Sequence, residues 1–141
     1  MRKQLGFTLM EMMITIVILG ILVGVAFPAY QGQMSSARRA TAAGCLTEYA
    51  QYMERIFSAN MTYVSNNGVP VTALPATNCS KDLTGLYGFS FGTPPTATTF
   101  TISATPLGAQ SGDTCGALTI DQLGVRTANG TTNAATISAC W

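Results

Sequence analysis

The chain has 141 residues, a formal net charge of +1, and 48% hydrophobic but only 9% charged residues, which is one domain's worth of sequence with little charge. Seven Lys and Arg against six Asp and Glu leave no surplus for a broad basic face that binds nucleic acid. Histidine is absent, which excludes His-based nucleophile pairs and His-ligated metals. We therefore expect a protein that is not an enzyme and uses no cofactor or metal.

An apolar segment lies near the start of the chain. Residues 7–29 are long enough to cross a hydrocarbon layer of ~30 Å as a helix at about 1.5 Å per residue. Arg2 and Lys3 precede the segment, so we expect the N-terminus in the cytoplasm and the rest of the chain outside. Glu11 interrupts this apolar segment. Inserting its charged side chain near the membrane core costs roughly 2.5 to 3.5 kcal/mol, so we expect Glu11 to have a positively charged partner. An acid in the apolar run also fits a retained anchor better than a secretory signal.

The chain resembles the N-terminus of a type IV prepilin at Gly6-Phe7-Thr8-Leu9-Met10-Glu11, in the apolar run that follows, and at Pro28. The resemblance implies a leader over residues 1–6 that a membrane prepilin peptidase removes after Gly6. It also implies methylation of the new amino terminus at Phe7. Residues 7–29 would form the transmembrane and filament-core half of a helix, and residues 30–141 the periplasmic or extracellular head.

The freed amine of Phe7 is a cation that can pair with Glu11. Within one helix the two residues have i, i+4 spacing; between chains, a newly docked subunit can offer its amine to Glu11 of a neighbour. The family's assembly mechanism prefers the second pairing. The alternative is a lone anchor whose Glu11 is protonated or reaches the membrane surface.

Gly20, Gly24 and Pro28 interrupt the first helical segment, and Pro28 removes a backbone hydrogen bond and favours a kink. In pilins the corresponding region bends or melts when subunits pack, so we interpret residues 20–28 as a site of conformational change. The alternative is that the small residues only permit close helix packing.

Helical periodicity continues to about Ala59, with an apolar stripe of Ala42, Cys45, Tyr49, Met53 and Ile56. A helix from Phe7 to Ala59 would be about 80 Å long, too long for the core of a globule of this size. We expect its second, amphipathic half to pack on a sheet.

Residues 60–83 are predicted to form a loop with little regular structure, because Asn, Gly, Pro, Thr and Ser dominate there. A period of two then predicts strands at Tyr87–Phe91, Phe100–Thr105, Leu118–Ile120 and around Val125–Ala128. These patterns predict an α+β fold in which the long helix packs on three or four antiparallel strands, as in the type IV pilin fold.

The four cysteines, at 45, 79, 115 and 140, form no C-x-x-C motif, and an even count in an exported domain favours disulfides. The sequence does not determine their connectivity. We favour Cys45 with Cys79, which ties the loop to the helix stripe, and Cys115 with Cys140, which closes the C-terminal segment. The second bridge resembles the cysteine-bounded D-region of pilins.

The stretch from Ala104 to Ile120 and the ending Cys140-Trp141 resemble the PilE-like subfamily, which includes minor pilins used in twitching, attachment and DNA uptake. The predicted function is a minor pilus subunit, whose partners are other pilins, the prepilin peptidase and the assembly platform of the inner membrane. Before assembly it would span the inner membrane, and afterwards lie in the extracellular filament. A pseudopilin of type II secretion is an alternative.

Some PilE-like proteins bind DNA through a basic stripe; a host surface is a further possible partner, through the Thr-rich surface of this chain. The candidate DNA contacts here are Lys81 and Arg126, together with Arg38 or Arg39; solvated surface charge is the plainer interpretation. We expect Trp141 to pack beside Cys140.

Overall fold

The computed structural model describes residues 6–141, so the predicted leader residues 1–5, with Arg2 and Lys3, lie outside the described range. The chain divides into two units, Met1–Met34 and Ser35–Trp141, which we describe separately. Helix α1, Leu9–Asn60, contributes to both.

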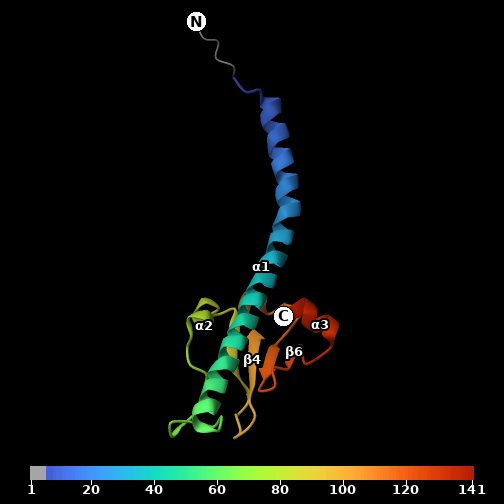
Figure 1. Ribbon diagram of the computed structural model, residues 1–141. Helices are drawn as coiled ribbons and strands as arrows, with labels where there is room; N and C mark the ends of the chain where they lie inside the picture. Colours follow the sequence, from blue (N-terminus) through green and yellow to red (C-terminus); the bar gives the residue numbers. More distant parts are fainter. Residues whose placement is uncertain (1–5) are drawn as a thin grey trace. The chain divides into compact units, whose positions relative to one another are not determined.

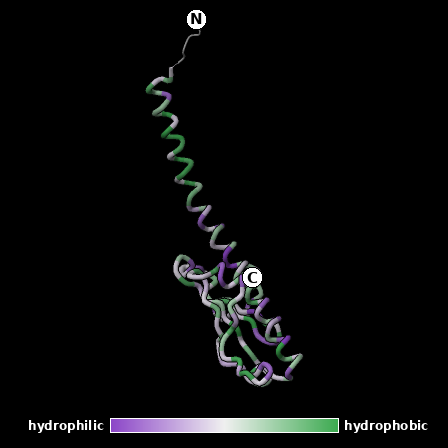
Figure 2. The backbone as a smooth tube through the Cα atoms, turned by 90° about the vertical axis from the view of Figure 1, so that its left-hand side faces the viewer, coloured by the Kyte–Doolittle hydropathy of each residue, from purple (hydrophilic) through white to green (hydrophobic). Residues whose placement is uncertain are grey.

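In the first unit, α1 exposes its side chains on all sides from Leu9 to Gln33. Most of this stretch is hydrophobic (Figure 2), and by length and composition it suits a membrane span. The helix continues without a break through Gly20, Gly24 and Pro28. The helix therefore accommodates Pro28 despite the lost backbone hydrogen bond, and the predicted kink at these residues stays a prediction.

The second unit is built on a four-stranded antiparallel sheet in the order β3-β4-β5-β6. The strands are β3 (Tyr87–Thr93), β4 (Thr101–Pro106), β5 (Leu118–Asp121) and β6 (Arg126–Ala128). Alternate residues face inward, which confirms the predicted period of two. Figure 1 shows the second half of α1 crossing the sheet in front of β4.

The core of the head lies between this half of α1 and the sheet. All five residues of the predicted apolar stripe are buried, and Ala43 and Leu46 join them. The buried residues of the sheet include Tyr87, Ile102, Ala104, Leu118, Ile120 and Ala128, and Phe100, just before β4, is buried with them. The Tyr49 ring lies 5.6 Å from that of Phe89, so aromatic packing adds to aliphatic contact between the two layers. The predicted α+β architecture is confirmed.

The connection from residue 60 to 83 is more regular than predicted. It contains a hairpin, β1 (Ser65–Asn66) paired with β2 (Val69–Pro70), and a short helix, α2 (Asn78–Asp82). Asn67 and Gly68 both have positive φ, as a two-residue hairpin turn requires. Thr77 caps α2 through a capping box with Ser80.

Two further elements were not predicted. A 3-10 turn, η1 (Gly108–Gln110), lies between β4 and β5, and helix α3 (Ala134–Cys140) follows β6. Asn133 caps α3 by accepting hydrogen bonds from the N–H groups of Ala135 and Thr136.

Two disulfides close the head. Cys45 of α1 is joined to Cys79 of α2, and Cys115 before β5 is joined to Cys140 at the end of α3. These are the pairings that the sequence analysis favoured. The first fastens the connection after α1 to the helix stripe, and the second encloses β5, β6 and α3 in one loop.

Candidate functional sites

The predicted assembly residue Glu11 lies in the first turn of α1 and is held by Thr8. The backbone N–H and the hydroxyl of Thr8 both donate to Oε2 of Glu11, each at 3.0 Å. The N–H of Glu11 donates back to the Thr8 hydroxyl at 3.2 Å. This reciprocal arrangement is a capping box, and it fixes the carboxylate at the positive end of the helix.

Phe7 precedes this cap. Because α1 begins at Leu9, Phe7 lies outside the helix, and the i, i+4 relation to Glu11 on one helical face is not present here. The Phe7 side chain is 86% exposed. The sequence analysis missed the role of Thr8, although Thr8-x-x-Glu11 before an apolar run is the sequence signature of a capping box.

Arg39, one of the candidate DNA contacts, is bound inside the head. Its guanidinium contacts Oδ1 of Asp113 at 2.6 Å, and the exposed fractions of the two side chains are 14% and 1%. The N–H of Cys115 donates to the same carboxylate oxygen. Among residues 6–141 this is the one ion pair within 4.0 Å, and it neutralises the charge that a DNA phosphate would need.

The second oxygen of Asp113 extends the network. The Tyr87 hydroxyl donates to Oδ2 at 3.0 Å, and burial raises the pKa of Tyr87. The amide of buried Gln110 donates to the hydroxyl of Tyr87 and to the backbone carbonyl of Ser35. The β4–β5 connection is thereby fastened to α1 at Ser35. No local sequence pattern predicts these hydrogen bonds, because the partners are 75 residues apart.

Lys81 and Arg126 are both exposed, but the structure places them far apart. Lys81 lies in α2, which contacts β3, and Arg126 lies in β6, at the opposite edge of the sheet (Figure 1). Three inter-strand steps separate those edges, or roughly 14 Å. The two side chains therefore do not form a single patch.

Trp141 packs on Arg126. The guanidinium carbon of Arg126 lies 5.0 Å from the centre of the indole ring, and the indole N–H donates to the Thr127 carbonyl at 3.0 Å. The packing role expected for Trp141 is therefore present. The contact also restrains the Arg126 side chain while leaving it exposed.

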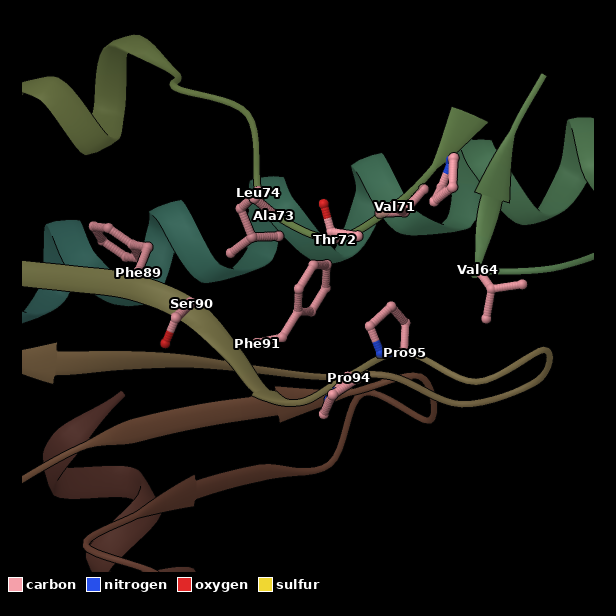
Figure 3. Close-up of a pocket in the computed structure, with 11 residues that line it drawn as sticks. Val64, Val71, Thr72, Ala73, Leu74, Phe89, Ser90, Phe91, Pro94 and Pro95 are labelled. Carbon is pink, nitrogen blue, oxygen red and sulfur yellow. The ribbon is translucent and has the colours of Figure 1, made fainter. Parts of the chain in front are cut away.

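A groove of about 590 Å³ lies between the connection after α1 and strand β3 (Figure 3). Leu74 and Thr72 lie over it from one side, and Phe89 and Phe91 from the other. Its lining contains no charged residue and none of the predicted site residues. It therefore offers no cation to neutralise a phosphate group.

Comparison with known families distinguishes a pilin from a protein that is merely anchored by an apolar helix. Residues 1–27 match the prokaryotic N-terminal methylation motif. Residues 28–119, more than half of the chain, match the family described as type IV minor pilin ComP, DNA uptake sequence receptor. The chain belongs to this pilin family. The family and its fold are those of structural proteins, and membership implies association with other pilin subunits in a pilus.

Individual relatives match this pilin mainly in short segments. It is 55% identical over 38 residues to the fimbrial protein EcpB of Eikenella corrodens, covering 27% of this chain and 24% of that protein. It is 48% identical over 44 residues to a type IV major alpha-pilin of Moraxella bovis, covering 31% and 28%. The match thus spans about a quarter of the length of these relatives.

Two solved structures share the fold. A type IV pilin from Shewanella oneidensis is 28% identical, with a TM-score of 0.53 over 76% of this chain and 97% of the other. The non-core minor pilin PilV of Neisseria meningitidis is 22% identical, with a TM-score of 0.51 over 72% and 93%. Both likenesses agree with the long helix and antiparallel sheet described above.

Proposed function

We propose that this pilin is cleaved after Gly6, anchored by residues 7–29 in the inner membrane with its N-terminus in the cytoplasm, and then inserted into a pilus. In the filament, residues 30–141 form the exposed head. Cleavage requires a prepilin peptidase, and insertion requires an assembly platform in the same membrane. Support comes from the methylation motif over residues 1–27 and from the apolar, fully exposed start of α1, which needs lipid or other helices to cover it. No catalytic role is proposed.

Glu11 and the amine of Phe7 form the pairing that drives docking. The capping box occupies Oε2 of Glu11, whereas Oε1 has no hydrogen-bond donor within residues 6–141. An amine from an incoming subunit can bind Oε1 without breaking the cap. Because Phe7 lies outside the helix, this observation supports pairing between subunits rather than within one. Bending at residues 20–28 during packing remains part of the proposal.

Blocking cleavage tests this assignment. A Gly6→Leu variant should remain in the membrane with its leader attached and should be absent from sheared filaments, because no amine is created at Phe7. Gly32→Ala is the matched control, since Gly32 lies in open space on an exposed part of α1. Filament incorporation of the uncleaved Gly6→Leu chain would contradict the proposal.

Of twitching, adhesion and DNA uptake, we infer that DNA uptake is the role best supported, and that the head is a DNA receptor. The observation that carries this inference is the match of residues 28–119 to a family described as a DNA uptake sequence receptor. The same match favours a pilus subunit over a pseudopilin of type II secretion.

The charges of the head set a limit on how it binds DNA. Of the seven basic and six acidic residues, Arg2, Lys3 and Glu11 precede residue 35, which leaves five of each in the head. Arg39 is neutralised by Asp113, so four cations remain for phosphates: Arg38, Arg55, Lys81 and Arg126. With two to four phosphate contacts, the slope of log K against log salt should be about −2 to −4 for duplex DNA.

The full-length pilin in detergent, titrated with duplex DNA at several salt concentrations, tests this role. Arg126→Gln should weaken binding and make the salt slope shallower by about 1, because one phosphate contact is lost. Glu48→Gln is a control that removes an exposed charge of opposite sign. If binding is unmeasurable even at low salt, the head is not a DNA receptor. If Arg126→Gln leaves both affinity and slope unchanged, Arg126 does not contact the DNA.

A further inference from the structure

The head contains two Asn-Gly pairs, Asn67-Gly68 and Asn129-Gly130. Asparagine followed by glycine is chemically labile, because glycine has no side chain to hinder attack by its own backbone nitrogen on the asparagine side chain. The lability depends on whether the side chain is free to move toward that nitrogen. The two pairs differ in this respect.

Asn67-Gly68 forms the turn of the β1–β2 hairpin, and all four residues 67–70 are exposed. The Asn67 N–H donates to Oδ1 of the Asn60 side chain at 2.9 Å, but the Asn67 side chain has no hydrogen-bond partner among the described residues, and nothing lies within 4 Å of a Cβ placed on Gly68. The strands have two residues each, and Pro70 has no N–H to contribute to the ladder. The turn can therefore open locally at little cost.

Asn129-Gly130 is also exposed, but this turn contacts the segment that leads into β5. Ala128 and Thr131 exchange two backbone hydrogen bonds across this turn, and the N–H of Asn129 donates to the Ala117 carbonyl at 3.0 Å. The Asn129 side chain lies against Gly116, where a Cβ would meet Oδ1 at 3.0 Å and the amide carbon at 3.2 Å. The disulfide between Cys115 and Cys140 encloses the turn. Opening this turn therefore means losing the contacts with Ala117 and Gly116 as well as its own two backbone hydrogen bonds.

We propose that Asn67 is a site of spontaneous deamidation in the folded head and that Asn129 is protected. The backbone nitrogen of Gly68 attacks the side-chain amide carbon of Asn67, a new C–N bond closes a five-membered imide, and the side-chain nitrogen leaves as ammonia. Water then opens the imide at either carbonyl, giving aspartate or isoaspartate. No redox reagent is involved. Each event places a negative charge on a head in which basic and acidic residues are equal in number.

The test is an ageing experiment on the full-length pilin in detergent at mildly alkaline pH and physiological temperature. Peptide mass spectrometry follows the mass increase of amide-to-acid conversion at each Asn, and an isoaspartate-specific methylation assay identifies the product. Conversion at Asn67 should run several-fold faster than at Asn129. In reduced, urea-unfolded protein the two rates should become similar, because both pairs are then Asn-Gly in a flexible chain.

Matched variants separate the two sites. Asn67→Gln should remove most of the acidic species that appear on ion exchange, whereas Asn129→Gln should leave them unchanged, and fresh Asn67→Asp should elute with the aspartate form. Two results would overturn the proposal. One is an Asn67 that stays intact in the folded pilin while it converts in urea, and the other is an Asn129 that converts as fast as Asn67 in the folded state.

Discussion

Residues 9–33 of α1 expose their side chains on every side, whereas seven apolar residues between 42 and 56 of the same helix are buried in the core of the head. The second stretch belongs to a unit with its own core, two disulfides and an internal ion pair. Among residues 6–34, by contrast, no side chain is buried. The head is therefore stabilised by contacts within its own unit. The apolar side chains of the first half of α1 need a membrane or other helices of a filament to cover them. Variants in the two regions should therefore fail in different assays.

The largest expected effect is on assembly. Glu11→Ala should leave processing after Gly6 intact but reduce the pilin in sheared filaments to background, because the incoming amine has no acceptor. The head should fold normally. Glu48→Ala, which removes an exposed acid of the head, is the matched control. Normal incorporation of Glu11→Ala would break the proposed pairing.

Loss of a disulfide should act only on the head. The bridges close loops with sequence separations of 34 and 25 residues. Removing either one with a paired Cys→Ser change should lower the free energy of unfolding by about 3 to 4 kcal/mol in the chain-entropy account. Chemical denaturation followed by circular dichroism measures the loss. Equal stability with and without the Cys115–Cys140 bridge would show that this loop is held by its other contacts.

The ion pair should have a smaller effect. Asp113→Asn leaves the Arg39 cation nearly buried without its partner, which should cost about 2 to 4 kcal/mol in unfolding free energy. Asp82→Asn at an exposed position is expected to be near neutral. The same denaturation experiment compares the two, and an equally small effect at both sites would mean that the network with Tyr87 and Gln110 contributes little.

Thr8 tests the start of the first unit. Thr8→Val removes the hydroxyl of the capping box and should cost about 1 kcal/mol of local helix stability, whereas Thr8→Ser keeps it. We expect Thr8→Val to reduce filament incorporation partially, and less than Glu11→Ala does. Immunoblotting of filament and membrane fractions gives the ratio. Identical incorporation of the two Thr8 variants would show that the cap does not position Glu11.

The smallest effect concerns Tyr63, which donates to Glu54 at 2.7 Å. Burial, together with Glu54, raises the pKa of Tyr63 to about 12, above its ordinary value of 10. The folded head holds this proton more tightly, so the stabilisation is complete below pH about 10 and is lost as pH rises toward 12. The thermal unfolding temperature should fall less between pH about 10 and 12 for Tyr63→Phe than for the wild type. Parallel curves would contradict the assignment.

Periodicity was sufficient to predict the architecture because both layers of the core are regular. The stripe from Ala42 to Ile56 and the alternation in β3, β4 and β5 each encode burial locally. The hairpin at Asn67-Gly68 and the caps at Thr77 and Asn133 had recognisable local signals, but these were outweighed by the polar composition around them.

The site was predicted less completely than the fold. Glu11 could be identified because an acid in an apolar run is costly to bury in a membrane. Its partner Thr8 was missed, although Thr8-x-x-Glu11 is a capping-box pattern. The pairing of Arg39 with Asp113 had no local signal, since the two residues are 74 positions apart. Likewise, only the strand order shows that Lys81 and Arg126 lie at opposite edges of the sheet.

The most direct test of the account is mass spectrometry of sheared surface filaments and of membranes, searching for the peptide that begins at Phe7. The account predicts an N-methylated Phe7 peptide in the filament fraction, at a low ratio to the major pilin, as expected of a minor subunit. A protein found only in membranes, with residues 1–6 still attached, would contradict the filament assignment and leave an anchored extracellular domain in its place.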